Sequence, residues 1–169
     1  TFPSYANGRY DRSKWTAKEV PDSANLCIRC RVTGDEFTIA RGRVNKALQR
    51  LDIDDIVNGC LVGHKCRCAR ACLTLFTVTQ IRQLRYKILQ TSDERATTIL
   101  LARMIGLAAG GNLEYQLCNT PVCSGAFGRL LGVSASKVWR ARRLLNSDGS
   151  VGDYVQGNKG QTYHKVSFV

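Results

Sequence analysis

Three of the eight cysteines in this 169-residue chain stand close together, in the run GHKCRCARAC that contains Cys66, Cys68 and Cys72. Cysteines at this spacing cannot readily bridge one another with good disulfide geometry. Three thiolates on one tight loop instead suit a tetrahedral zinc ion, which needs a fourth ligand from a distant segment. Cys123 is the best candidate, because it lies in the first turn of an expected helix whose positive end favours a thiolate. We therefore expect a structural Zn²⁺ site, with no open position for water, formed by Cys66, Cys68, Cys72 and Cys123.

Cys27 and Cys30 form a second motif, the C-x2-C spacing of CIRC, which is used in metal-binding knuckles. The other ligands of this candidate second site are Cys60 and Cys118, and His64 is either a further ligand or a surface histidine. The competing interpretation of the eight cysteines is a secreted protein with four disulfides. Because four bridges do not explain the three clustered cysteines, the spacing favours zinc.

The positive charge of the chain is both large and unevenly distributed. The net charge is +12 at pH 7, and the stretches 64–90 and 129–143 contain Lys and Arg but no acidic residue. This pattern favours a polyanionic partner over ordinary solvated surface charge: double-stranded DNA first, with RNA as the alternative. The longest apolar stretch, 97–110, is interrupted by Arg103, so we expect no membrane span and no membrane partner.

Residues 121–145 predict two helices joined by a sharp turn at Gly132, because glycine adopts the positive φ angle of such a turn without steric cost. Ser134 would cap the second helix with its hydroxyl. That helix buries Val138 and Ala141 and presents basic side chains on its other faces, which suits the major groove of DNA. The DNA contacts expected on this helix are Ser136, Lys137, Arg140, Arg142 and Arg143.

A β-hairpin is expected after the two helices. Residues 151–155 and 163–169 predict two strands, separated by a glycine-containing turn at 156–160. Lys159, at the tip of the hairpin, would then lie near a phosphate. Two helices followed by a hairpin have the order of a winged helix-turn-helix. The alternative is a helical hairpin used for packing or dimerisation, which leaves a homodimer open.

The upstream periodicity predicts further helices. One lies within residues 35–57, a second opens at Phe76-Thr77, and a third runs from a capping box of Thr91 and Glu94 to Gly110-Gly111. A short strand is expected at 112–118, and a further helix at Thr120-Pro121. Together these elements predict a mainly α fold with a small β-hairpin: a zinc-stabilised helical domain with a winged helix-turn-helix. The expected regions are an irregular arm at 1–26, a cysteine-containing helical region at 27–111 and the winged helix-turn-helix at 112–169.

The order of these motifs resembles the N-terminal region of transposon-derived, transposase-like proteins of animals and protists. The resemblance covers residues 64–165 and rests on C-x-C-x3-C, on Phe76-Thr77 at a helix start, on V-C-x3-F-x3-L-G-V-S at 122–134, and on Gly157–Gly160 with His164. It implies a DNA-binding module in which Cys66, Cys68, Cys72 and Cys123 are the shared zinc set. The ribonuclease-H-like catalytic domain of complete transposases has no counterpart here.

We expect a sequence-specific DNA-binding protein, transposase-like or regulator-like and located in the nucleus, without a catalytic centre of its own. There is no glycine-rich phosphate loop, and no Ser or Cys nucleophile with a histidine signature. The alternative is a zinc-binding structural protein of a ribonucleoprotein, such as a mitochondrial ribosome. Because the sequence begins at Thr1, we also expect a processed form or an excised fragment.

Overall fold

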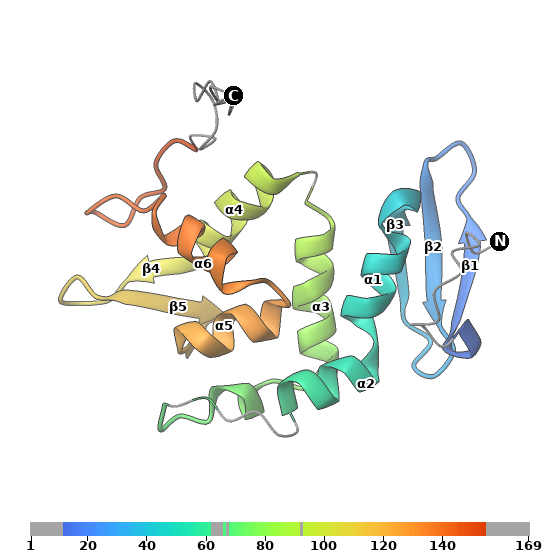
Figure 1. Cartoon of the computed structure of the whole chain (residues 1–169), viewed down its shortest axis with the longest axis horizontal. Helices are drawn as coiled ribbons and strands as arrows, with labels where there is room; N and C mark the ends of the chain where they lie inside the picture. The colour runs from blue at the N-terminus through green and yellow to red at the C-terminus, as the bar shows by residue number, and fades with distance from the viewer. Residues whose placement is uncertain (1–11, 62–65, 67, 92, 155–169) are drawn as a thin grey trace, which may run out of the picture.

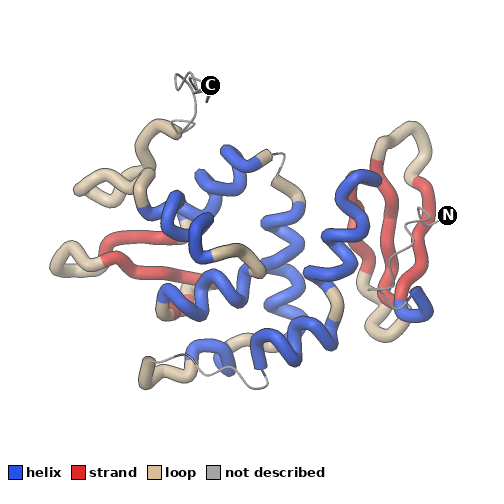
Figure 2. The backbone as a smooth tube through the Cα atoms, in the orientation of Figure 1, coloured by secondary structure: helices blue, strands red, loops and turns tan. Residues whose placement is uncertain are grey.

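The computed structural model describes residues 12–61, 66, 68–91 and 93–154. Its architecture is arranged around the longest described helix, α3 (Val78–Leu89), with a three-stranded antiparallel sheet on either side (Figure 1). Figure 2 shows the two sheets toward opposite ends of the molecule, with helices between them. Within the described residues no helix is both long enough and apolar enough to cross a membrane.

The first sheet contains β1 (Trp15–Glu19), β2 (Asn25–Cys30) and β3 (Glu36–Ala40), in that order and antiparallel. Alternate residues of β2 are buried, which makes one face of the sheet apolar. The short 3-10 turn η1 (Arg12–Lys14) precedes β1, and the turn η2 (Arg41–Arg43) leads from β3 into α1 (Val44–Leu51). Helix α1 buries its apolar stripe in the same core as Trp15, Phe37 and Ile39.

Three short elements connect α1 to α3: α2 (Ile53–Ile56), the π-helical turn η3 (Val57–Leu61) and the 3-10 turn η4 (Cys72–Leu75). Helix α3 then begins at the expected place, because Thr77 and Gln80 form a reciprocal capping box. Its residues Ile81, Leu84 and Ile88 belong to the larger core, and Leu89 belongs to the core of the first sheet. Helix α3 therefore joins the two cores.

The larger core contains the second sheet and the last three helices. Helix α4 (Glu94–Arg103) is followed by β4 (Ile105–Leu107), β5 (Leu113–Leu117) and β6 (Thr120–Val122), which pair in that order. Helix α5 (Ser124–Leu131) and helix α6 (Ala135–Arg142) follow. As expected, Gly132 ends α5 in the left-handed conformation, with φ of 64°, and Val133 is buried in the corner before α6. Helix α6 packs against α4.

The fold is mixed α/β, not mainly α with a small hairpin. Residues 12–26 are not irregular, since they form η1, β1 and the start of β2. The helix expected within 35–57 begins only at Val44, because residues 36–40 form β3. The expected boundaries after residues 26 and 111 each fall inside one of the two sheets. The missed strands were hidden because short three- to six-residue strands carry little periodicity.

The predicted helix start at Thr120-Pro121 is also wrong. Cys118 and Asn119 both have positive φ, of 49° and 60°, which is the two-residue turn of a tight hairpin. The chain therefore returns as β6, with Pro121 paired opposite Gln116. β6 is an edge strand, where the missing N–H of a proline is tolerated.

The third helix differs from its prediction at both ends. Asp93 caps it, with its side chain accepting a hydrogen bond from Ala96 N at 2.7 Å, while the Thr91 hydroxyl donates to Ile88 O. The helix ends at Arg103, because residues 105–107 form β4, and Gly110-Gly111 occupy the following turn at positive φ. The strand expected at 112–118 is confirmed as β5.

The expected wing lies mostly outside the described residues, which end at Tyr154. The described part of the predicted strand at 151–155 forms only an isolated bridge between Val151 and Leu145. Lys159, the turn at 156–160 and the strand at 163–169 lie beyond the described part of the chain.

Two arginines of α3 are buried, although their charge predicted exposure. Arg82 is 2% exposed and pairs with Asp35 at 2.6 Å, while its guanidinium lies over the rings of Trp15 and Phe37. Arg82 thus anchors α3 to the first sheet.

Arg85 ties together the ends of two helices that are far apart in the sequence. Its Nη1 donates to Arg50 O of α1 at 3.0 Å, and its Nη2 and Nε donate to Arg129 O and Leu130 O of α5 at 3.0 and 3.2 Å. Carbonyls at a helix C-terminus lack partners within the helix and carry the negative end of its dipole, so a cation stabilises them. Arg85 therefore positions the α5–α6 turn against α1.

We expect Arg85→Met to lower the free energy of unfolding by about 2–4 kcal/mol, because it leaves buried carbonyls without a donor. Arg31→Met is the matched control, since Arg31 is exposed in the turn after β2 and should change stability by less than about 0.5 kcal/mol. Urea unfolding of the three proteins measures the difference. Equal stability of the two variants would contradict the role of Arg85.

Candidate metal centre and basic helix

The structure brings four cysteines together from two separate segments. Cys66 and Cys68 lie in the loop before η4, Cys72 is the first residue of η4, and Cys123 is the residue that caps α5. Ala71 takes a left-handed conformation, with φ of 47°, immediately before Cys72. Cys123 comes from a separate segment, directly after strand β6 of the β5–β6 hairpin. Four thiols are thus gathered by a tight loop and a helix start.

The geometry of this cluster fits a tetrahedral ion. The four sulfur atoms all lie within 4.8 Å of one another, and the Cys66–Cys68 and Cys68–Cys72 sulfur pairs are 3.2 and 3.3 Å apart. Zinc–sulfur bonds of about 2.3 Å place the sulfurs of a tetrahedron about 3.8 Å apart. The cluster could therefore hold a metal ion such as zinc, in agreement with the ligand set expected from the spacing.

Backbone amides support three of the sulfurs. Cys72 N donates to the Cys66 sulfur at 3.2 Å, Cys123 N donates to the Cys72 sulfur at 3.4 Å, and Ala126 N donates to the Cys123 sulfur at 3.4 Å. Such donors stabilise thiolates, the form that binds metal. The last bond also caps α5, which couples the cluster to the first turn of that helix.

Without a cation, the four thiols cannot all ionise side by side. Hydrogen bonds from the Cys66 and Cys72 thiols lower the pKa of Cys68 to about 6. Burial raises the pKa of Cys72 to about 12 and also raises the pKa of Cys123. A divalent cation reverses this situation, because its charge offsets the repulsion among the thiolates. The donor set therefore suits a soft, thiolate-binding ion.

The candidate second site receives no support from the described side chains. Cys27 and Cys30 are three residues apart in β2, so they point to opposite faces of the sheet. Cys118 is exposed in the β5–β6 turn, and the side chain of Cys60, like all of His64, lies outside what the structure describes. Within the described residues, the group of side chains that could hold a metal ion consists of Cys66, Cys68, Cys72 and Cys123.

Most of the basic residues singled out in the sequence lie on the surface of α6. Ser136, Arg140, Arg142 and Arg143 are exposed and Lys137 is half-buried, while Val138 and Ala141 face the core. Ser134 begins the helix, as expected, but its hydroxyl bonds to Ser136 rather than to a backbone amide. The remaining predicted contact, Lys159, is not in the described part of the chain.

Two interactions order this exposed face. Arg140 forms a salt bridge with Glu94 at the start of α4. The Arg143 guanidinium lies 4.9 Å from the ring centre of Trp139, whose side chain is 53% exposed. Trp139 thus lies on the exposed side of α6, next to the cations. Its exposure makes the face both basic and aromatic.

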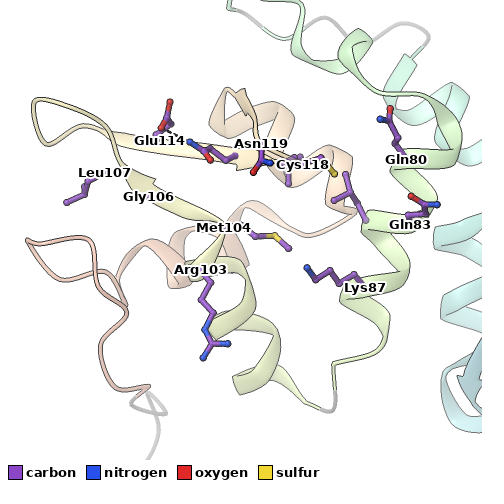
Figure 3. Close-up of a pocket in the computed structure, with 13 residues that line it drawn as sticks. Gln80, Gln83, Lys87, Arg103, Met104, Gly106, Leu107, Glu114, Cys118 and Asn119 are labelled. Atoms are coloured by element: carbon purple, nitrogen blue, oxygen red, sulfur yellow. Dashed lines mark hydrogen bonds between the residues drawn. The ribbon is translucent and has the colours of Figure 1, made fainter.

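A groove of about 550 Å³ lies between α3 and the second sheet (Figure 3). Helix α3 contributes Gln80, Gln83 and Lys87, and the β5–β6 turn contributes Cys118 and Asn119. These amides and charges can form hydrogen bonds with a ligand. Among the described residues, no histidine lines this groove.

The burial of Arg85 was not predicted from the sequence, although its position in the helix indicated it. Arg85 is four residues after Ile81 and three before Ile88, so it lies on the buried stripe of α3. Its charge suggested exposure, and only the helix ends packed beside it explain its burial.

No protein-family model, curated protein or solved structure matches this chain. The resemblance to transposase-like proteins therefore stays a prediction.

We expect the chain to bind one zinc ion and Cys123→Ser to lose most of it. Serine keeps the cap on α5, because its hydroxyl can accept the same amide hydrogen bond, so the loss reports on the missing ligand. Cys118→Ser, outside the cluster, is the control and should retain the metal. Elemental analysis measures the zinc, and cobalt absorption reports a tetrahedral thiolate site. Equal zinc content in both variants would contradict this ligand set.

Proposed function

We propose that this chain is a zinc-stabilised, sequence-specific DNA-binding protein in which α5 and α6 act as a helix-turn-helix. The observation that carries the proposal is the exposed face of α6, which follows directly on a glycine turn and bears Lys137, Arg140, Arg142 and Arg143. A short helix with one buried stripe and a basic outer face fits the major groove.

Some residues on this face would contact base edges, and others would contact phosphates. Lys137 and Arg140 lie in the first two turns of α6, the part of a recognition helix that reaches base edges. Arginine and lysine donate to the O6 and N7 atoms of guanine. Arg142 and Arg143, at the far end of the helix, are better placed for phosphates, which fix the register of a protein on its duplex.

The Glu94–Arg140 pair supports a role in selectivity. The exposed carboxylate holds the Arg140 side chain in the free protein, and a guanine edge would compete for the same guanidinium. A DNA sequence without a hydrogen-bond acceptor at that base would leave Arg140 paired with Glu94. The pair therefore raises the cost of binding an incorrect sequence.

Zinc would act as a structural brace for this reading unit. The cluster joins the 66–72 loop to the cap of α5, across 51 residues of sequence between Cys72 and Cys123. Because α6 follows α5 after a three-residue turn, the metal would also restrain the position of α6. Four thiolate ligands leave no open position for catalysis at the metal.

We expect Lys137→Ala with Arg140→Ala to weaken duplex binding by about tenfold or more and to reduce the salt dependence of binding. Each lost phosphate contact lowers the salt slope by about 0.9, and a lost base contact removes about 1–3 kcal/mol of discrimination. Fluorescence anisotropy with labelled duplexes, selected for tight binding from a random pool, measures affinity at several salt concentrations.

The control for this measurement removes two cations elsewhere. Lys18→Ala with Arg31→Ala changes the net charge equally, and both side chains are exposed on the first sheet. If the two double variants bind duplex DNA alike, α6 is not the reading helix. If the chain binds structured RNA with high affinity and duplex DNA only weakly, the ribonucleoprotein alternative is correct and the DNA proposal fails.

Removal of zinc should show whether the metal supports the DNA contacts that we propose for α6. We expect chelation of zinc to weaken duplex binding by at least about tenfold, because the α5 cap loses its tie to the 66–72 loop. Circular dichroism and anisotropy on the same sample follow helix content and affinity, and added zinc should restore both. Full affinity in the chelated protein would contradict the bracing role.

A further inference from the structure

Helix α1 and the turn before α6 meet at Arg85 of α3, although 83 residues of sequence lie between the end of α1 at Leu51 and Ala135 at the start of α6. Arg85 spans the junction, since its guanidinium donates to Arg50 O and to Arg129 O. Gly132 lies against the same side chain, because a Cβ atom there would be 3.3 Å from Arg85 Nε. The last turn of α1 and the turn that leads into α6 therefore meet at one buried arginine.

This junction concentrates positive charge on the surface. Lys46 and Arg50 are four residues apart on α1 and share one side of the helix, which contains no acidic residue. We call these two side chains the α1 basic face. Lys46 is exposed and Arg50 is half-buried, and within the described part of the chain neither has a carboxylate within salt-bridge distance.

Lys46 of the α1 basic face lies within electrostatic reach of Lys137, near the start of α6. The positive charges of Arg50, Lys137 and Arg43, together with partial burial, lower the pKa of Lys46 and outweigh the carboxylate of Glu94. The Glu94 carboxylate does not act on Lys46 alone, because it also forms a salt bridge with Arg140. Arg43 is occupied with the carbonyls of Leu89 and Thr91.

The free protein thus holds like charges together without a matching acid. A like-charged pair at this helical spacing destabilises the helix, so the arrangement does not serve folding. A line of phosphates would relieve the repulsion, and release of its counterions would add affinity.

We propose that the α1 basic face binds the phosphate backbone of duplex DNA beside the groove entered by α6. This inference rests on the proposed function of α6. It adds a second contact surface, from a separate part of the chain, that contributes affinity and register without reading sequence. The two surfaces together would hold α6 at a fixed angle in the groove.

The test compares Lys46→Gln, Lys46→Arg and the control Lys18→Gln in the full chain. The probe is a random-sequence duplex of about 20 base pairs, two helical turns, beside a duplex selected for tight binding. We expect Lys46→Gln to lower the salt slope by about 0.9 and to weaken binding about three- to tenfold at about 0.1 M salt, equally for both duplexes. Lys46→Arg should bind like the unaltered chain, because it keeps the cation.

A stability measurement separates phosphate binding from a structural role. Neutralising Lys46 removes a repelled charge, so the unfolding midpoint of Lys46→Gln should equal or exceed that of the unaltered chain. Weaker binding together with a lower midpoint would overturn the inference. So would a salt slope that matches Lys18→Gln, a cation exposed on β1 at the far side of the molecule (Figure 1).

Failure of this inference differs from failure of the proposed function. If Lys137→Ala with Arg140→Ala weakens binding and Lys46→Gln does not, α6 reads DNA and the α1 basic face is not involved. If the unaltered chain shows no salt-dependent duplex binding, or binds structured RNA alone, both proposals are wrong.

Discussion

The arrangement of this protein depends on a buried guanidinium that satisfies the ends of two helices. Arg85 donates to carbonyls of α1 and α5, which belong to the two different cores. Carbonyls at a helix end are expensive to bury without donors, and one fork-shaped side chain supplies three of them here. The cation also faces the negative ends of two helix dipoles. Together with Arg82, which anchors α3 to the first sheet, Arg85 therefore helps to set how the two sheets lie relative to each other.

The cysteine cluster is a second tie, and it acts on the opposite end of α5. Cys123, in contact with Cys72, caps the start of that helix, and Arg85 donates hydrogen bonds to its last carbonyls, so both ends of an eight-residue helix are tied to groups distant in sequence. A helix of this length is marginal by itself. Its stability has to come from such ties and from the buried residues Ala126, Phe127, Leu130 and Leu131. A bound ion would strengthen the end that the core covers least.

Repulsion among the cations of the basic surface destabilises the fold, and the two ties offset this effect. Arg50 and Lys137 lie close enough to lower the pKa of Lys46, and the nearby carboxylate of Glu94 is shared with Arg140. A junction held by Arg85 and by the cysteine cluster can keep these cations together, because neither tie depends on surface charge. A polyanionic partner would then meet a preformed surface and would not have to order it.

The sequence by itself predicted the cluster of four cysteines, the start of α3, the glycine turn and the buried stripe of α6, because each depends on residue type and local chemistry. It missed the first sheet and β6, since short strands are defined by partners that periodicity does not reveal. It placed Pro121 in a helix, whereas pairing with β5 makes it an edge-strand residue. The burial of Arg85 and the meeting of Lys46 with Lys137 were decided only by the tertiary structure. Both require α1 and the α5–α6 turn to pack on α3, and interactions across 35 or more residues of sequence leave no mark in the local pattern of either segment.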